Sequence, residues 1–211
     1  MKLSIGAVAL VAVLVAPLVG AAQEAELSAN VGWASEYFYR GVLQKPSSAS
    51  VGLDLAVSKV YLGTWAADVG DGNEVDVYAG VGTEVEHFSV SVGGTGYFYT
   101  DDAFDQTYLE GNFNAGYGPI SGEFSYGRHM ATAGDEDYWF LAATVEQWGL
   151  YATFGTFGKD LDGEYYEGGY SLSVGDLDLS AAWIYSTADL IGADAHTIVF
   201  GISHTFGIDI N

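Results

Sequence analysis

Apolar or small residues occupy every second position in several short segments of this chain. The clearest alternations run from Val51 to Val57, Val75 to Val81, Leu109 to Tyr117 and Leu177 to Tyr185. Successive side chains of a β-strand point to opposite faces, so this period predicts strands with one apolar face. We therefore expect an all-β protein without helices.

Twelve such segments follow one another along the chain. The connections after the even-numbered segments are short pairs such as Ser58-Lys59 and Gly118-Pro119. Those after the odd-numbered segments are longer and mostly acidic, beginning with the loop predicted at residues 41–48. Tight turns are thus expected at one end of the sheet and loops at the other. The segments are 27–40, 49–57, 60–67, 74–84, 87–99, 107–117, 120–128, 138–146, 149–158, 164–174, 177–186 and 196–206.

The order of turns and loops predicts how the sheet closes. An even strand number, both chain ends on the tight-turn side and alternating turns and loops are typical of outer-membrane β-barrels. We therefore predict an up-and-down antiparallel transmembrane β-barrel of about 12 strands in the outer membrane of a Gram-negative bacterium. The parity of three segments, 60–67, 87–99 and 138–146, is not clear from the sequence, and Gly93-Gly94 suggests a bulge.

Aromatic residues gather near both ends of the predicted strands. Membrane barrels carry such residues at both water interfaces, so we expect two lipid-facing belts. The alternative, the core of a soluble β-sandwich, would not sort aromatics by strand end. The loop-end group is Tyr37 to Tyr39, Trp65, Tyr97 to Tyr99, Tyr108, Tyr138 to Phe140 and Tyr165 to Tyr166; the turn-end group is Tyr61, Phe88, Tyr117, Trp148 and Phe206.

The chain begins with features of an export signal. Lys2 precedes an apolar run that ends near Leu18, and small residues follow up to Ala22. The run is shorter than the roughly 20 residues of a membrane-spanning helix, which is the alternative interpretation. We therefore predict a cleaved signal peptide at residues 1–22 and a barrel domain at 23–211.

Charge and composition exclude several other classes. The formal charge is −22, and it becomes −23 when Lys2 leaves with the signal peptide. A nucleic-acid partner is excluded because binding phosphate needs a basic surface. The chain has no cysteine and therefore no disulfides, thiolate metal sites or lipidated N-terminal cysteine. Aromatics make up 15% of the residues, which indicates a folded chain rather than an acidic disordered one.

The segment NVGWASEYFYRG, residues 30–41, places Glu36 and Arg40 among aromatics. Strand parity puts these two charges on one face and Val31, Trp33, Tyr37 and Tyr39 on the other. In a membrane barrel the apolar face would contact lipid, and Glu36 and Arg40 would face a wet lumen, as a pore-lining pair or as a structural clasp. The same parity gives the candidate pore-lining residues Glu36, Arg40, Asp54, Asp76, Glu84, Glu110, Glu123, Glu167 and Asp178.

Catalytic and metal chemistry have weaker support. Ser203 and His204 are neighbours on a strand and face opposite sides, and His129 has only Thr132 as a conceivable hydroxyl partner. We predict no catalytic residues, no enzyme activity, no cofactor and no dedicated metal site. The acidic loops at 101–105, 135–137 and 160–164 supply oxygen ligands that suit loosely bound Ca²⁺ or Mg²⁺; the alternative is a solvated acidic rim.

The run NVGWASEYFYRGVLQ, with Gly52, Asp54 and the later YLGTWAADV at residues 61–69, resembles a known bacterial family. The family is that of the proteobacterial TorF-type porins, also called Gcw_chp proteins of unknown function. The similarity is clearest over residues 28–100 and continues to Phe206. The resemblance implies an outer-membrane channel and brings no substrate or catalytic residue with it.

Together these patterns predict an outer-membrane porin with a narrow, passive and cation-preferring channel for small solutes. The alternative is a non-transporting barrel, either a structural or surface-interaction protein or a soluble periplasmic barrel that binds a ligand. Expected partners are outer-membrane lipid and lipopolysaccharide, together with small solutes or cations. The sequence indicates no oligomeric state.

Overall fold

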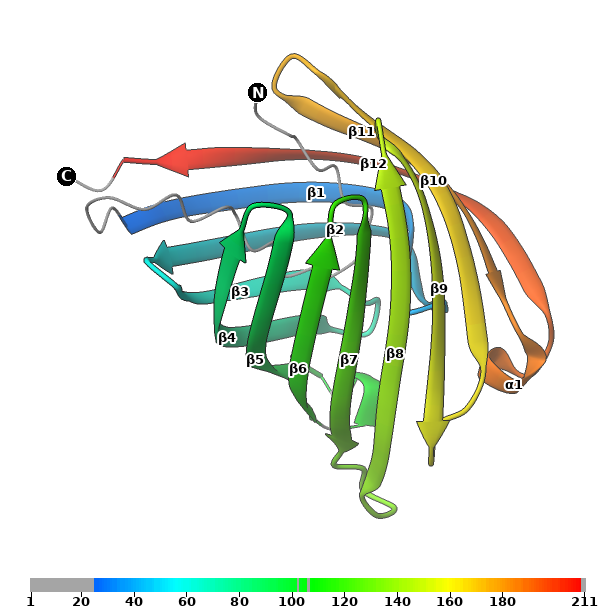
Figure 1. Cartoon of the computed structure of the whole chain (residues 1–211). Helices are drawn as coiled ribbons and strands as arrows, with labels where there is room; N and C mark the ends of the chain where they lie inside the picture. Colours follow the sequence, from blue (N-terminus) through cyan, green and yellow to red (C-terminus); the bar gives the residue numbers. More distant parts are fainter. Residues whose placement is uncertain (1–24, 102, 106, 210–211) are drawn as a thin grey trace.

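A computed structural model describes residues 25–209 except 102 and 106, and over this range the chain forms a closed antiparallel barrel (Figure 1). Each strand pairs with its neighbours in sequence, and β1 closes the barrel against β12. The predicted signal peptide lies outside the described residues. The strands are β1 (Ala25–Tyr39), β2 (Val42–Val57), β3 (Val60–Asp68), β4 (Asn73–Val85), β5 (Phe88–Tyr99), β6 (Tyr108–Tyr117), β7 (Ile120–His129), β8 (Glu136–Gln147), β9 (Leu150–Lys159), β10 (Glu164–Val174), β11 (Leu177–Ser186) and β12 (Ala195–Ile208).

The alternation in the sequence sorts side chains between the two sides of the barrel wall. On β6, Leu109 and Phe113 are exposed on the outer side, whereas Glu110 is buried and Asn112 half-buried on the inner side. Apolar side chains that stay exposed on all sides of a closed barrel are expected where lipid is the solvent. The predicted fold class is therefore confirmed, with apolar residues outside and polar residues inside.

Register is continuous through the strands whose parity the sequence left open. On β5, Gly93 pairs with Gly80 and Asn112 without a shift, so the suggested bulge at Gly93-Gly94 is wrong. On β8, Tyr138 and Phe140 face inward and Leu141 outward. The sequence pattern failed there because aromatic residues occupy the inner face as well as the outer face.

The first loop prediction is also wrong. The chain turns at Arg40 and Gly41, whose φ angles are +46° and +80°, and β2 starts immediately after them. Two positive φ angles in a two-residue connection match the twist of a β-hairpin. Residues 42–48, expected as part of a loop, belong to β2, and Pro46 pairs with Glu36 inside the hairpin.

The remaining loops are short, and two of them contain helical turns. The 3₁₀ helix η1 (Ala103–Asp105) lies between β5 and β6, and α1 (Ala188–Ile191) lies between β11 and β12. The expectation of a helix-free chain is therefore wrong in these loops, where Gly192 ends α1 with a φ of +85°. Within the described ranges, no helix is long and apolar enough to span a bilayer.

Aromatic side chains point outward at the turn end of the barrel, whereas several at the loop end point inward. At the turn end, Phe88, Tyr117, Trp148 and Phe206 are exposed as a lipid-facing belt requires. Tyr61 departs from this belt, because a Cβ at Gly80 or Gly93 would touch its hydroxyl on the inner wall. At the loop end, the predicted belt is wrong for five residues that lie inside the barrel and are at most 4% exposed: Tyr37, Tyr97, Tyr138, Phe140 and Tyr165.

Inward tyrosines pack across glycines of neighbouring strands. A Cβ on Gly127 would lie 2.4 Å from Tyr138, and one on Gly155 would lie 2.2 Å from Tyr165. No side chain larger than hydrogen fits beneath these rings. Tyr138, Phe140 and Tyr165 belong to one buried cluster in the loop half of the barrel.

The loop end should face the cell exterior, because barrels of this class carry longer loops outside and short turns in the periplasm. Ala133 is exposed between β7 and β8, and the chain has no natural cysteine. We expect an Ala133→Cys variant to react with a membrane-impermeant maleimide on intact cells. A cysteine at Gly175, in a turn at the opposite end, serves as the control and should react only after the outer membrane is opened. The reverse pattern would contradict this topology.

Candidate functional site

The tip of the β1–β2 hairpin bends into the barrel at the loop end. The Ser186 hydroxyl of β11 donates a 2.6 Å hydrogen bond to the Gly41 carbonyl. A Cβ at Gly41 would lie 2.4 Å from the Cβ of Tyr165 on β10, so only glycine fits. The tip is therefore held against β10 and β11, and Arg40 is directed into the lumen.

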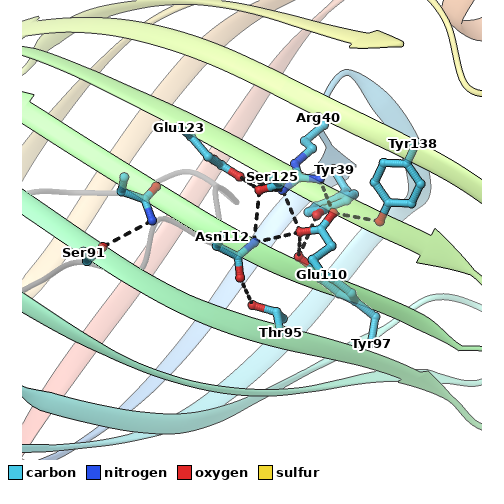
Figure 2. Close-up of polar contacts among 11 residues, drawn as sticks. Tyr39, Arg40, Ser91, Thr95, Tyr97, Glu110, Asn112, Glu123, Ser125 and Tyr138 are labelled. Carbon is cyan, nitrogen blue, oxygen red and sulfur yellow. Dashed lines mark hydrogen bonds and ion pairs between the residues drawn. The ribbon is translucent and has the colours of Figure 1, made fainter. Parts of the chain in front are cut away.

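Arg40 crosses the lumen to the opposite wall. Its Nη1 and Nη2 donate to both oxygens of Glu110 on β6, at 2.5 and 3.0 Å, and Nη2 also donates to Glu123 on β7, at 2.6 Å. Figure 2 shows the guanidinium between these two carboxylates. In the strand order, β7 is the farthest strand from β1 in both directions around the barrel. We call Arg40, Glu110 and Glu123 the Arg40 clasp; it ties the two sides of the barrel together.

Aromatic rings enclose the clasp. The Arg40 guanidinium carbon lies 4.1 Å from the ring centre of Phe140 and 4.8 Å from that of Tyr39. The hydroxyls of Tyr138 and Tyr97 donate to Glu110, at 2.7 and 3.1 Å. A planar guanidinium suits this combination of bidentate pairing and ring stacking, which lysine would not reproduce.

Neutral polar side chains complete the network beside the clasp. The amide nitrogen of Asn112 donates to Glu110 and to Ser125, each at 3.0 Å. Its oxygen accepts a 2.9 Å hydrogen bond from Thr95 (Figure 2). Ser125 also donates to Glu123, at 2.8 Å. A fully bonded network of this kind fixes side-chain positions and makes the constriction rigid.

A second pair of carboxylates lies on β4, at Glu74 and Asp76, and both are buried. The Tyr37 hydroxyl donates a 2.5 Å hydrogen bond to Glu74. Asp76 pairs in register with Trp65 on β3 and Tyr97 on β5. The loop half of the lumen thus contains at least four carboxylates and one guanidinium.

Exposure of the inner wall increases toward the turn end. Glu84 is exposed near the end of β4, and Asp54 and Asp178 are half-buried. Asp54 accepts hydrogen bonds from Tyr78 and Asn30, and Asp178 accepts one from Ser173. The barrel interior is therefore exposed to solvent at the turn end and buried at the loop end, where it forms a constriction.

All nine predicted pore-lining residues lie on the inner side of the wall, but their surroundings differ from the wet lumen predicted. Arg40, Asp76, Glu110 and Glu167 are buried, whereas the other five keep some exposure to solvent. Glu36 and Arg40 do not pair with each other: Glu36 accepts a hydrogen bond from Thr197, and Arg40 binds the opposite wall. The wet-lumen prediction is therefore wrong for the loop half.

The assignment of Tyr37 and Tyr39 to lipid is wrong as well. Tyr37 binds Glu74, and the Tyr39 hydroxyl donates to that of Tyr97 at 2.7 Å, so both rings lie inside. The tip of the β1–β2 hairpin lies inside the barrel, so side chains from both of its faces contact the inner wall. Simple alternation counted from Val31 cannot detect this arrangement.

Glu74 was the acidic residue of the constriction that sequence reasoning missed. It lies two residues before Asp76 on the same strand, so strand parity could have found it. Tyr97 and Tyr138 were identified only as belt aromatics. Their role as donors to Glu110 depends on contacts across strands, which composition does not reveal.

The histidines considered for catalysis have structural contacts. His129 stacks on Tyr108 with ring centres 3.9 Å apart and lies 3.4 Å from a Glu136 oxygen. His204 contacts the backbone oxygen of Asp176. Among the residues that the structure describes, no group of three or more acidic, histidine or cysteine side chains is arranged to hold a metal.

A separate charged cluster lies on the outer side of the loop-end rim, beyond the apolar band. Asp137 accepts hydrogen bonds from Arg128 at 2.7 Å and from Lys159 at 3.3 Å. These contacts, above all the one from Arg128, lower the pKa of Asp137 to about 2. At another point of the rim, the ammonium of Lys45 lowers the pKa of Asp68. Both carboxylates therefore remain ionised at physiological pH.

These features define the class of the molecule. A closed barrel with an apolar outer face and a charged, hydrogen-bonded interior is a membrane-spanning structure. Barrels of this kind lie in the bacterial outer membrane. The protein is an outer-membrane β-barrel. The chain belongs to the Gcw_chp family of bacterial proteins of unknown function, whose sequence profile matches residues 19–206.

Comparison with solved structures supports the fold. A structure from work on the in-meso crystallization of membrane proteins is 10% identical, with a TM-score of 0.62, over 88% of this chain and 85% of that one. OccAB2 of Acinetobacter baumannii gives 13% identity and a TM-score of 0.45 over 85% of this chain and 60% of its own. OccK1 of Pseudomonas aeruginosa gives 13% identity and a TM-score of 0.42 over 78% of this chain and 58% of its own. This chain thus spans less than two thirds of either Occ protein. No curated protein matches it at a significant level.

Proposed function

We propose that the protein is a passive outer-membrane channel for small solutes, with a narrow and cation-preferring lumen. The observation that carries the proposal is the polarity of the inner wall, where charged and hydroxyl side chains replace the apolar packing of a solid core. The resemblance of residues 28–100 to TorF-type porins supports the same function.

Narrowness follows from strand number and from the Arg40 clasp. Barrels of eight strands are just filled by side chains, whereas those of 16–18 strands leave a wide aqueous channel. A 12-stranded barrel lies between these limits. Because the Arg40 clasp and the rings of Tyr39 and Phe140 occupy its loop half, we infer that only small solutes pass and that the clasp sets the limiting width.

Cation preference follows from the charges of the inner wall. Within the described residues, Arg40 is the one Lys or Arg that is buried: Lys59 is exposed in the turn between β2 and β3, and Lys45, Arg128 and Lys159 pair with carboxylates at the loop-end rim. The inner wall carries many carboxylates, and rings of carboxylates concentrate cations and exclude anions. Lipid and lipopolysaccharide are the proposed surroundings, with divalent ions bridging the acidic rim.

The test is ion selectivity in planar bilayers. In a KCl gradient the reversal potential should show preference for K⁺ over Cl⁻. The preference should decline at high salt, because the Debye length falls from about 10 Å at 0.1 M to about 3 Å at 1 M. Replacing Glu84 and Asp178 with their amides should reduce the selectivity, because both face the solvated half of the lumen.

A matched control is Glu86→Gln, which removes the same charge from a tight turn outside the inner wall. It should leave the reversal potential nearly unchanged. Anion selectivity of the unmodified barrel, or equal effects of all three substitutions, would contradict the proposed lumen.

The aromatic clusters packed in the loop half favour one alternative, a non-transporting barrel that acts as a structural or surface-interaction protein. In that case correctly folded protein, verified by heat-modifiable migration in electrophoresis, should show no conductance. Loss of the Arg40 clasp should then also fail to produce conductance, because the aromatic clusters at Tyr37 and Tyr138 would still close the barrel.

A further inference from the structure

Asp76 is a carboxylate whose side chain has no hydrogen-bond partner among the described residues, in the loop half of the barrel wall. It faces inward from β4 and is 0% exposed. Neither carboxylate oxygen has a hydrogen-bond partner among the described protein atoms. The Thr64 hydroxyl, at 2.8 Å, donates to the backbone oxygen of Asp76 and leaves its side chain unbound. A buried ionised group in this state is strongly unfavourable unless a positive charge or a proton neutralises it.

The neighbours of Asp76 supply no such positive charge. Glu74, two residues earlier on the same face, adds a second buried carboxylate, and its hydrogen-bond donors are two phenols, Tyr37 at 2.5 Å and Tyr99. Arg40 is already bound to Glu110 and Glu123. Among the described residues, Glu110 and Glu123 therefore have a cationic partner, whereas the two carboxylates on β4 and Glu167 on β10 have none; Glu167 accepts a hydrogen bond from Tyr151, and only Asp76 has no donor at all.

We propose that Asp76 and Glu74 form an internal binding site for a divalent cation of the Ca²⁺ type. Two carboxylates match two positive charges, and carboxylate oxygens are ligands that Ca²⁺ prefers, with carbonyl oxygens and water completing the coordination. Strand parity places the two side chains on the same face of β4. The site is independent of conduction, since a closed barrel would need the same neutralisation.

Thermal unfolding tests the proposal on the complete mature barrel in detergent micelles. A ligand that binds the folded state raises the unfolding temperature as its concentration rises. Refolding in CaCl₂ should raise this temperature above that measured in NaCl of equal ionic strength. The variant Asp76→Asn should lose the response, with Ca²⁺ affinity weakened by about tenfold or more, because the amide carries no charge and keeps only one of the two carboxylate oxygens.

Two matched controls separate this site from other carboxylates. Glu84→Gln removes a lumen carboxylate at the solvated end of the same strand, and Asp160→Asn removes one from the acidic loop between β9 and β10. Both variants should keep the Ca²⁺ response. If Asp160→Asn removes the response and Asp76→Asn does not, the ion binds at the rim and the proposal fails.

A second readout needs no variant. Tb³⁺ occupies oxygen-ligand Ca²⁺ sites and emits when a nearby aromatic side chain transfers excitation to it. Trp65 and Tyr97 flank Asp76 in the sheet register, so bound Tb³⁺ should give sensitised emission that Ca²⁺ displaces. If the unmodified barrel shows neither Ca²⁺ stabilisation nor sensitised emission, a proton neutralises Asp76 and the proposal is overturned. If the barrel conducts but shows no Ca²⁺ binding, only the proposed cation site fails. If it binds Ca²⁺ but does not conduct, only the proposed channel fails.

Discussion

Arg40→Gln should destabilise the barrel by about 3–5 kcal/mol, because removing one partner of a buried ion pair leaves the other charge uncompensated. Arg40 is 6% exposed, and the Glu110 side chain beside it is 0% exposed. Chemical unfolding in detergent micelles, followed by tryptophan fluorescence, measures the loss. If the protein conducts, the same substitution should raise its single-channel conductance, since the side chain that crosses the lumen becomes shorter and loses its anchors.

The double variant Arg40→Gln and Glu110→Gln should recover much of the lost stability, because it removes the fully buried carboxylate together with its partner, while Glu123 keeps 20% side-chain exposure to solvent. Arg128→Gln is the control for general loss of an arginine. Arg128 pairs with Asp137 on the exposed outer rim, where an ion pair contributes at most about 1 kcal/mol. Equal destabilisation by Arg40→Gln and Arg128→Gln would show that the Arg40 clasp does not hold the barrel together.

Phe113→Arg should impair assembly into bilayers by about 2–4 kcal/mol, the cost of a cation on the lipid face near the membrane midplane. Phe113 is exposed halfway along β6, and its partners in register, Phe124 and Val92, are exposed apolar residues as well. No carboxylate is paired with it on the outer face. Folding yield in lipid vesicles, measured by heat-modifiable migration, reports the effect.

The neighbouring substitution Asn114→Arg gives the matched control. Asn114 faces inward and pairs with Glu123, so an arginine there would lie beside a carboxylate rather than in lipid. It should fold with nearly normal yield. If Phe113→Arg folds as well as Asn114→Arg, the outer face of β6 does not contact lipid.

The sequence by itself was enough to predict the barrel, because a closed antiparallel sheet in a membrane imposes a local rule on every strand. Outward positions must be apolar and inward positions polar, and the period of two is visible in segments such as Val75 to Val81. Strand ends could be placed from turn residues such as Gly118-Pro119. The nine candidate residues of the inner wall followed from the same parity, although their burial did not.

Only the tertiary structure decided what happens in the loop half of the lumen. Arg40 binds residues 70 and 83 positions away in the chain, and no local pattern encodes such a contact. The hairpin tip is held inside by the contacts of Gly41 with Ser186 and Tyr165, which lie more than 100 residues away in the chain. An aromatic residue is compatible both with lipid and with a packed interior. The direction of Tyr37 was therefore settled by its hydrogen bond to Glu74, a contact that exists only once the barrel has closed.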